Sequence, residues 1–594
     1  MTENKSGNIG HGGALPPRRE IAAWVIVGVV AATMRSVHLG WAPLTAVEAR
    51  EATLAWERVA GQGLLSDTYS PFLLAGNSLV FTLLGAGDAL ARLWPAIFGT
   101  ALALCPALLR RRLGRVGALG AGLYLALSPT ALVASRQVDG TIIATAGVMA
   151  LIGGLTMFAD TRRRGWLWFA AVGLALGLVS SSVVYGLVVP LGAAWIVKSE
   201  PWADDWSLWL ARKRSWLESY GVEFVVALIV GFLALSTGFG WNPSGIGAVG
   251  GVFVDWVRWF ELPQVPGAAP MTLLATYELA GLAWGVGGLI WSWYRRRPWA
   301  AFLTVWAGAA YFLVRVTRGG APTDLIVVVL PLAILTGLAV EWLGRGRWAS
   351  QTGIRVAYGA FVLVLWAQVY LMLARHALYG QSGDLALAGV IVLLQLLLVA
   401  SFGFVLGPRA TLRTWGAATS LVFLGLLISA GTGVAYRRTA DPREALVGQP
   451  TAVNIRDLVD TLVDLSWHRT GLPITLDFVY EAPADSVLAW YMRDFERARR
   501  VDHLAALTAD SFGPLVVTVD DAPGPAIAPG PDYVGQAFAL QRQWVADSLP
   551  CRLWQGDCRI GVRWFLFRDG PPLPEPVERA VLWREIDTTA GLGD

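Results

Sequence analysis

Residues 385–406 read LALAGVIVLLQLLLVASFGFVL, an apolar run without a single charged side chain. A helix that crosses a membrane needs about 20 such residues, so this stretch predicts a transmembrane helix. Comparable segments recur on both sides of it, from residue 21 to residue 434. They lie at 21–38, 90–109, 116–134, 141–158, 166–180, 183–197, 222–241, 271–294, 299–314, 323–343, 356–373 and 415–434. We therefore expect an α-helical polytopic membrane protein with about 13 transmembrane helices in residues 21–434.

The composition indicates the same class of protein. Of the 594 residues, 55% are hydrophobic and only 15% are charged, whereas about 25% are charged in typical soluble domains. The 29 Trp and 66 Gly also fit, because both residues are common in membrane helices or at their interfaces. The composition therefore excludes a soluble enzyme, a disordered protein and a disulfide-stabilised scaffold.

The formal net charge of +4 is unevenly distributed along the chain. Residues 435–594 hold 16 Arg and 23 acidic residues, a net charge of −7, which leaves +11 for the remainder. Arg-rich connections, such as 110–115 and 160–165, fall on one side of the predicted helices, the side shared with the N-terminus. Because basic connections stay in the cytoplasm, we predict a disordered cytoplasmic tail at 1–20 and an extracytoplasmic C-terminus. Topology thus explains the basic excess, and we expect no nucleic-acid partner.

Residues 435–594 have the composition of a soluble domain. Apolar residues at helical spacing in 454–471 are followed by a strand-like 474–478, a helix-like 485–495 and a strand at 514–519. This order predicts a small extracytoplasmic α/β domain.

Cysteine and histidine give limited information about this chain. Cys551 and Cys558 are near enough in sequence to close a small disulfide loop outside the cytoplasm, or they remain free. The five His are scattered, so no His-based metal site is predicted.

The first outer loop, 39–89, carries one group of candidate functional residues. Glu48 and Glu51 lie on one face of a predicted helix in 45–63, with arginines beside them, and 71–86 is expected to form an interfacial or re-entrant helix. The simpler interpretation of the charges is an amphipathic helix with local ion pairs. The functional interpretation is that one carboxylate serves as a general base.

Two further connections carry candidate residues on the same side. Arg136 and Asp139 lie in SRQVDG (135–140), and Arg315 and Arg318 lie in RVTRGG (315–320). The simpler interpretation of Arg136 and Asp139 is a helix cap. For Arg315 and Arg318 it is snorkelling of the side chains to the membrane interface. Together with the first loop, however, these residues predict one outer cavity. In it a carboxylate, Glu48 or Asp139, acts as a general base, and arginines hold a lipid-linked phosphate.

Several stretches resemble GT-C superfamily glycosyltransferases, which include protein O-mannosyltransferases and the lipid A aminoarabinose transferase. The matching stretches follow the family's order: EAREATLAWERVAGQG (48–63), SPFLLAGNSLVFTLLGAGDALARLWPAIFG (70–99), ALSPTALVASRQVDG (126–140) and TRGGAPTDLIVVVLPLAILTG (317–337). FGWNPSGI (239–246), TYELAGL (276–282) and LAWYMRDF (488–495) are similar to flippase-associated proteins of archaeal-type N-glycosylation clusters.

The resemblance implies a sugar transferase that uses a polyprenyl-phosphate sugar as donor, within the cell membrane and at its outer face. Membrane lipid, the lipid-linked sugar and a protein or glycan acceptor are the implied partners; the need for a divalent metal stays open. Family members usually carry Asp-Glu in the first loop, where this chain has Val47-Glu48. Either Glu48 or Glu51 substitutes for the missing base, or the chain is a non-catalytic scaffold or flippase-associated subunit of a membrane complex. A secondary transporter is the third hypothesis, but the sequence has no two-fold repeat to support it.

Overall fold

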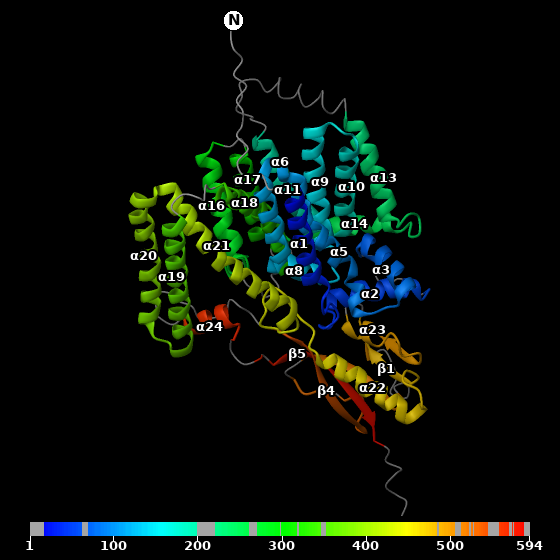
Figure 1. The fold of residues 1–594 in the computed structure, drawn as a ribbon. Coiled ribbons are helices and arrows are strands. Elements are labelled where there is room, and N and C mark those ends of the chain that lie inside the picture. Colours follow the sequence, from blue (N-terminus) through cyan, green and yellow to red (C-terminus); the bar gives the residue numbers. More distant parts are fainter. Residues whose placement is uncertain are drawn as a thin grey trace, which may run out of the picture.

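The computed structural model is a bundle of long helices with a small mixed α/β domain at one end (Figure 1). It describes residues 17–61, 69–198, 220–260, 270–296, 299–317, 320–345, 352–483, 486–504, 513–521, 524–526, 528–543, 558–569, 573 and 575–586. The chain is therefore a multi-pass α-helical membrane protein with a C-terminal domain, as the sequence predicts.

The helices of the bundle follow one another with short connections. They are α1 (Pro17–Ser36), α2 (Ala46–Val59), α3 (Pro71–Leu84), α4 (Asp88–Ala91), α5 (Leu93–Leu104), η1 (Cys105–Leu109), α6 (Arg110–Leu113), α7 (Arg115–Leu127), α8 (Pro129–Ser135), α9 (Thr141–Thr161), α10 (Gly165–Ser180), α11 (Val183–Lys198), α13 (Val222–Ser236), α14 (Gly245–Arg258), α15 (Pro270–Tyr277), α16 (Leu279–Tyr294), α17 (Ala300–Val316), η3 (Pro322–Leu325), α18 (Ile326–Gly344), α19 (Thr352–Tyr379), α20 (Ser382–Leu406), α21 (Pro408–Thr432) and η4 (Gly433–Arg437).

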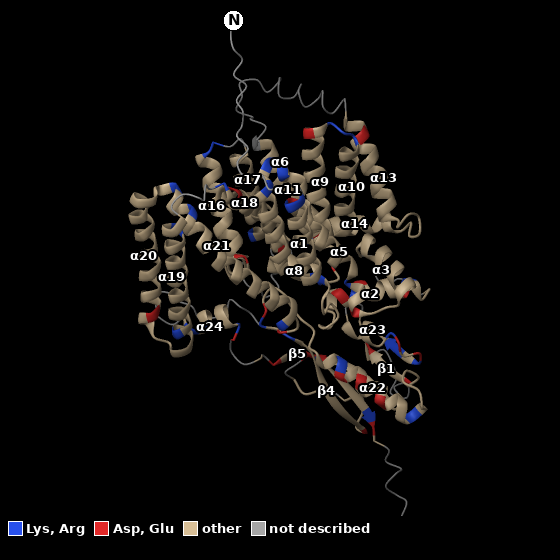
Figure 2. Ribbon diagram, in the orientation of Figure 1, with Lys and Arg blue, Asp and Glu red and all other residues tan. Residues whose placement is uncertain are grey.

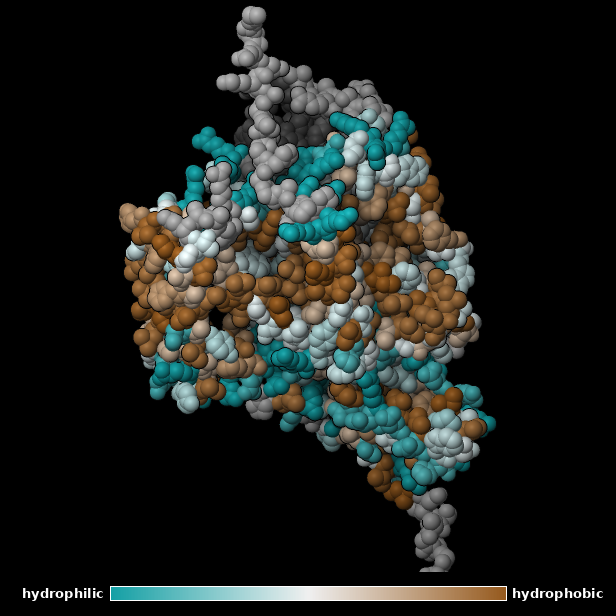
Figure 3. Space-filling model, viewed as in Figure 1, coloured by the Kyte–Doolittle hydropathy of each residue, from teal (hydrophilic) through white to brown (hydrophobic). Residues whose placement is uncertain are grey.

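Each of the predicted apolar segments contains helix. Within the described residues, six helical segments have the length and hydropathy of a membrane span, and two sharply bent helix pairs raise the total to eight. A further five apolar helices, including α3, are shorter. The count of 13 spans stays a prediction. An apolar belt crosses the middle of the surface between two polar ends (Figure 3), as expected for a protein in a bilayer.

The two bent pairs correct the sequence analysis, which treated 116–134 and 271–294 as single spans. The first span bends by 58° between α7 and α8, and the second bends by 94° between α15 and α16. Pro129 explains the first break, because proline lacks the amide that would continue the helical hydrogen bonds. Glu278 occupies the second break and is discussed below.

The predicted N-terminal tail is also shorter than expected. Residues 1–16 lie outside the described part, but Pro17 already begins α1, because proline is well suited to the first turn of a helix. Arginines of α6 and of the α9–α10 connection lie at the end of the bundle away from the C-terminal domain (Figure 2). We call this the arginine-rich end.

The C-terminal domain contains one sheet. Its elements are α22 (Asn454–Thr470), β1 (Phe478–Glu481), α23 (Val487–Tyr491), β2 (Ala498–Val501), β3 (Leu515–Asp521), β4 (Tyr533–Arg542), α24 (Arg559–Phe567) and β5 (Pro576–Glu585). The strand order is β2-β1-β3-β5-β4. β1 pairs in parallel with β2 and β3, whereas β5 pairs antiparallel with β3 and β4.

The helix predicted at 454–471 and the strand predicted at 514–519 are confirmed. Two other predictions were displaced: the strand begins at Phe478 instead of 474, and the helix expected at 485–495 is the single turn and a half of α23. The sequence analysis also missed β2, β4, α24 and β5. Cys558 is disulfide-bonded, and Cys551 lies outside the described residues.

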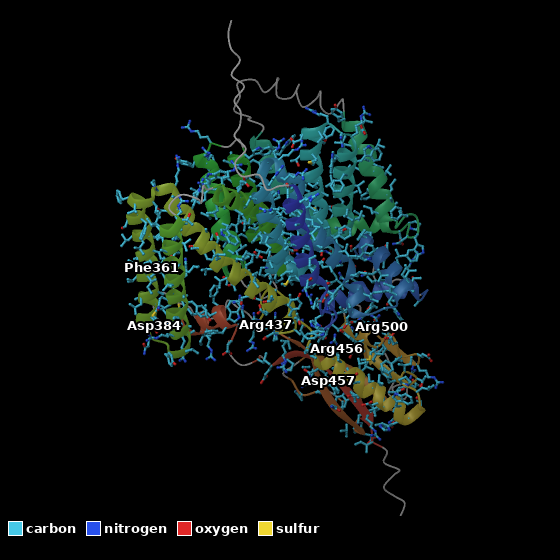
Figure 4. The ribbon with its side chains drawn as sticks, in the orientation of Figure 1. Phe361, Asp384, Arg437, Arg456, Asp457 and Arg500 are labelled. Atoms are coloured by element: carbon cyan, nitrogen blue, oxygen red, sulfur yellow. The ribbon has the colours of Figure 1, made fainter. Side chains whose placement is uncertain are left out.

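The first outer loop and the C-terminal domain share one hydrophobic core. Leu44, Ala49 and Ala52 of the loop belong to the same buried cluster as Leu458 and Trp490 of the domain. Asp88 provides the polar part of this contact, since its carboxylate accepts hydrogen bonds from Trp490 Nε1 (2.8 Å), Tyr491 Oη (3.0 Å) and Arg456 Nη2 (2.9 Å). Arg456 lies where the domain meets the bundle (Figure 4).

Replacing Asp88 tests this contact. In Asp88→Ala the indole, phenol and guanidinium lose their shared acceptor, so the domain should separate from the loop more readily, at a cost of about 1–3 kcal/mol. We expect limited proteolysis to remove the domain faster than in the wild-type protein. Asp460→Ala, at an exposed position of α22, is the control and should be cleaved at the wild-type rate. Equal cleavage of both variants would show that Asp88 does not hold the domain.

Candidate active site

A buried ion pair joins the first outer loop to the start of the bundle. Glu48, in the first turn of α2, faces Arg92, which directly precedes α5. Arg92 Nε lies 2.7 Å from Glu48 Oε1 and Arg92 Nη2 lies 2.9 Å from Oε2. Both side chains are almost completely buried. This two-point geometry is the strongest form of an arginine–carboxylate contact.

The remaining acceptor positions of Glu48 are also occupied. Its Oε2 accepts the Thr45 amide (2.9 Å), which completes a capping box at the start of α2. Its Oε1 accepts the Val138 amide (2.9 Å). Val138 belongs to the connection at 135–140, which we call the second outer connection after its predicted location. Four donors therefore fill the carboxylate. Glu48 holds two connections together and has no free lone pair for the proton of an acceptor.

Glu51 lies one turn further along α2, in a different environment. Its carboxylate is buried, accepts the Ser70 amide (3.3 Å) and lies 3.7 Å from Arg50 Nη2. Burial raises the pKa of Glu51 to about 7, opposed by the positive charge of Arg50 and reinforced by the negative charges of Asp139 and Asp255. A carboxylate with this pKa is suited to accept a proton near neutral pH.

Asp139 lies in the second outer connection and is half-buried. Its carboxylate accepts hydrogen bonds from the amide (3.3 Å) and the hydroxyl of Thr141. Burial raises the pKa of Asp139, the Thr141 hydrogen bonds lower it, and the charge of Glu48 raises it further. The negative charge of Asp139 in turn contributes to the raised pKa of Glu51.

Asp324 is a third carboxylate of this group, and the sequence analysis did not single it out. It lies in η3, before α18, is buried, and accepts the Ala321 amide (2.7 Å). Its charge interacts with that of Asp139. Three connections that are distant in sequence therefore contribute acids to one region. The available signal was the lone acid of TRGGAPTDL, which by itself looks like a helix cap.

The arginines predicted to bind phosphate are in three different situations. Arg136 is buried, and its Nη1 donates to the carbonyls of Met34, Arg35 and Val37, while Nη2 donates to that of His38. It therefore caps the end of α1, where a cation is favoured. Arg315 is exposed at the last turn of α17. Arg318 lies outside the described residues.

A small cavity of ≈ 40 Å³ adjoins the Glu48–Arg92 pair. Arg136 also lines it, as does Thr451 of the segment that leads into the C-terminal domain. The cavity is therefore bounded by both outer connections and by the domain. Among the described residues, no group of three or more His, Cys, Asp or Glu is arranged to hold a metal ion.

The FGWNPSGI motif contacts Tyr69, which lies next to a residue that binds Glu51. Asn242 is buried, and its Nδ2 donates to Tyr69 Oη (3.1 Å), while Ser244 Oγ donates to Asn242 Oδ1 (2.7 Å). Tyr69 precedes Ser70, whose amide binds Glu51. The motif thus holds Tyr69, and through the chain it holds the neighbouring Ser70, whose amide binds the Glu51 carboxylate.

Comparison with solved structures agrees with this architecture. ArnT from Cupriavidus metallidurans in the apo state matches with a TM-score of 0.52 and 18% identity, covering 84% of this chain and 93% of that one. ArnT bound to undecaprenyl phosphate matches with a TM-score of 0.51 and 16% identity, covering 85% and 94%. An Archaeoglobus fulgidus oligosaccharyltransferase matches at 12% identity over 85% and 70% of the chains, but its TM-score of 0.44 carries no weight here.

These similarities establish the fold. No protein-family model and no curated protein matches the chain. The protein therefore has the fold of ArnT, one of the proteins that the sequence resembles.

Breaking the Glu48–Arg92 pair should be costly. In Arg92→Gln, a buried carboxylate loses its counter-ion, which destabilises a protein by about 3–5 kcal/mol. We expect a lower yield of folded protein and a clearly lower melting temperature. Arg111→Gln, at an exposed position of α6, should leave the melting temperature unchanged. An unaltered melting temperature in both variants would contradict the central role of the pair.

The raised pKa of Glu51 predicts how stability depends on pH. The folded protein keeps the Glu51 proton up to about pH 7, whereas the unfolded chain releases it near pH 4.3. The stability that comes from a protonated Glu51 is therefore present at low pH and is lost as pH rises through this window. Glu51→Gln should melt like the wild type at pH 4 and several degrees higher at pH 8. A difference of the opposite sign would exclude the raised pKa.

Proposed function

We propose that this protein transfers a sugar from a polyprenyl-phosphate donor to an acceptor at the end of the bundle that faces the C-terminal domain. The observation that carries the proposal is the group Glu51, Asp139 and Asp324, in a bundle with the fold of ArnT. A buried carboxylate with a pKa near 7 supplies what such a transfer requires of the protein, a general base.

The transfer is a substitution at the anomeric carbon of the sugar. The acceptor hydroxyl or amine forms a bond to that carbon, and the bond between the carbon and the phosphate oxygen breaks. The polyprenyl phosphate leaves with the bonding electron pair, and the acceptor proton passes to Glu51 or Asp139. The product has inverted configuration.

The arginines divide the work of binding the donor. Arg315 is exposed and is therefore able to reach a lipid phosphate that arrives from the membrane, and we assign the same role to Arg318. Arg136 donates to four carbonyl oxygens, so it contributes positive charge to the cavity without a direct contact. Glu48 holds both outer connections in place.

We also propose the orientation that the charge distribution favours. The arginine-rich end lies away from the C-terminal domain (Figure 2), and arginines are retained on the cytoplasmic side of membranes. The N-terminus is then cytoplasmic, and the site and the C-terminal domain face outward. In this orientation the domain, which lines the cavity through Thr451, helps to select a protein or glycan acceptor.

The alternative function is that of a non-catalytic subunit in a membrane complex. It is motivated by Val47, whose side chain is 59% exposed at the position where the resembled family carries an acid. This alternative predicts binding of polyprenyl phosphate without turnover, and recovery of stoichiometric partners from native membranes.

A transfer assay separates the two functions. Purified protein is incubated with a panel of radiolabelled polyprenyl-phosphate hexoses, and cell-envelope material is the acceptor. We expect transfer whose rate rises with pH to a plateau, with a midpoint near 7, as Glu51 ionises. Glu51→Gln and Asp139→Asn should each lower the rate, by about 10²-fold or more for the residue that is the base. The control Asp457→Asn, at an exposed position of α22, should match the wild type.

Two outcomes would count against the proposal. Full activity of both Glu51→Gln and Asp139→Asn would remove these residues from the chemistry. Lack of transfer from every donor, together with tight binding of polyprenyl phosphate, would favour the non-catalytic subunit.

A further inference from the structure

The two broken spans meet at one buried carboxylate. Ser128 is the residue between α7 and α8, and Glu278 is the residue between α15 and α16. Glu278 has no exposed surface, and its acidic side chain lies between helices that pack within the bundle. Of the described residues, none forms an ion pair with it. An ionisable residue in this setting is costly and is retained when it has a role.

Within the described part of the chain, the donors to the Glu278 carboxylate lie on the other broken span. Its Oε2 accepts Tyr124 Oη (2.6 Å), and its Oε1 accepts Ser128 Oγ (2.6 Å) and the Thr130 amide (3.1 Å). Tyr124 lies in the last turn of α7, Ser128 is the break itself and Thr130 is in the first turn of α8. One carboxylate therefore binds both sides of the bend and satisfies an amide that the break leaves without a helical partner.

Two residues next to the break, Gly281 and Tyr277, shape the surroundings of Glu278. A Cβ at Gly281 would lie 2.1 Å from Tyr124 Oη, so the glycine is what allows the phenol to reach Glu278. Tyr277 donates to Glu444 Oε2 (2.7 Å), which ties the preceding turn to the segment that enters the C-terminal domain. Glu278 is thus held from both sides of the break between α15 and α16.

The direction of α8 decides where the second outer connection lies. α8 is a single short helix, and Arg136 and Asp139 follow it within a few residues. If α8 continued the axis of α7 instead of bending by 58°, Asp139 would be carried away from Glu51. Asp139 itself makes its side-chain hydrogen bonds with residues that follow it closely in the chain, Thr141 and Gly140. Its position relative to Glu51 depends on the backbone that precedes it.

We propose that Glu278 is a positioning residue that fixes the bend between α7 and α8 and thereby sets the position of Asp139 in the connection that follows α8. This inference rests on the proposed function for its effect on catalysis, but its structural part is independent of activity. Glu278 does not touch the reacting atoms. It acts through α8, from within the bundle.

Glu341, a residue of α18, provides a control because it binds the opposite end of α7. It is also buried, and its carboxylate accepts the Gly117 amide near the start of α7 (2.9 Å) and lies 2.7 Å from Arg345 Nε. Glu278→Gln and Glu341→Gln each remove a buried negative charge, the first at the bend between α7 and α8 and the second at the start of α7. Only the first variant should affect the second outer connection.

Hydrogen–deuterium exchange tests the structural part without any assay of transfer. In Glu278→Gln, peptides from 128–140 should exchange about tenfold faster than in the wild type, because the end of α8 opens locally. Peptides from 115–127 should change little, and Glu341→Gln should leave 128–140 as in the wild type. Tyr124→Phe, a milder change that removes one of the three donors, should give an intermediate rate. Unchanged exchange of 128–140 in Glu278→Gln and Tyr124→Phe would overturn the inference.

A double-mutant cycle tests the link to catalysis. Glu278→Gln should lower kcat about tenfold and leave the KM for the donor unchanged, since misplacement of a catalytic group affects the chemical step. In the Asp139→Asn background the same change should cause no further loss, because residues that act as one unit are not additive. An equal loss in both backgrounds would indicate general damage to the fold and would overturn this part. If no transfer occurs in any variant, including the wild type, the proposed function fails while the exchange result still decides the role of Glu278.

Discussion

The architecture of the site depends on the ion pair between Glu48 and Arg92. Each partner is buried, so each would be costly alone, and the pair is stable because backbone groups complete its hydrogen bonds. Arg92 also donates to the carbonyls of Leu39, Ala42 and Pro43, while Glu48 accepts amides from both outer connections. The first outer loop, the start of α5 and the second outer connection therefore meet at these two side chains. The acid that the sequence resemblance presented as a catalytic candidate is the one that organises the others.

Charges inside this bundle consistently secure breaks and ends of helices. Glu278 holds the bend that precedes α8, Arg136 caps the last carbonyls of α1, and Glu341 binds the start of α7. A membrane offers no water to these backbone groups, so protein side chains must satisfy them. The same polar contacts fix the outer connections that hold Glu51 and Asp139. Stability in the membrane and geometry of the site therefore arise from one set of interactions.

The first outer loop belongs to two parts of the molecule at once. Its apolar face completes the core of the C-terminal domain, while Glu51 on the same helix contributes to the acidic group. Glu57 adds a link, since it lies 3.5 Å from Arg500 of β2, a residue at the boundary with the domain (Figure 4). The helix that carries the proposed base is thus in direct contact with the C-terminal domain.

The sequence alone determined the class of the protein, because apolar runs of membrane length and an uneven charge distribution need no tertiary information. It also placed Glu51, Asp139 and Arg136 in outer connections, through local motifs. The tertiary structure decided their roles. Arg136 caps a helix and Glu48 is fully bound, and both facts depend on residues 44 to 102 positions away in the chain. Asp324 joins the acids only through folding, since its local sequence is that of an ordinary cap. Length and hydropathy did not locate the bends at Ser128 and Glu278, although Pro129 and Glu278 mark both positions in the sequence. What the sequence could not show is that the two breaks meet through hydrogen bonds of the Glu278 carboxylate.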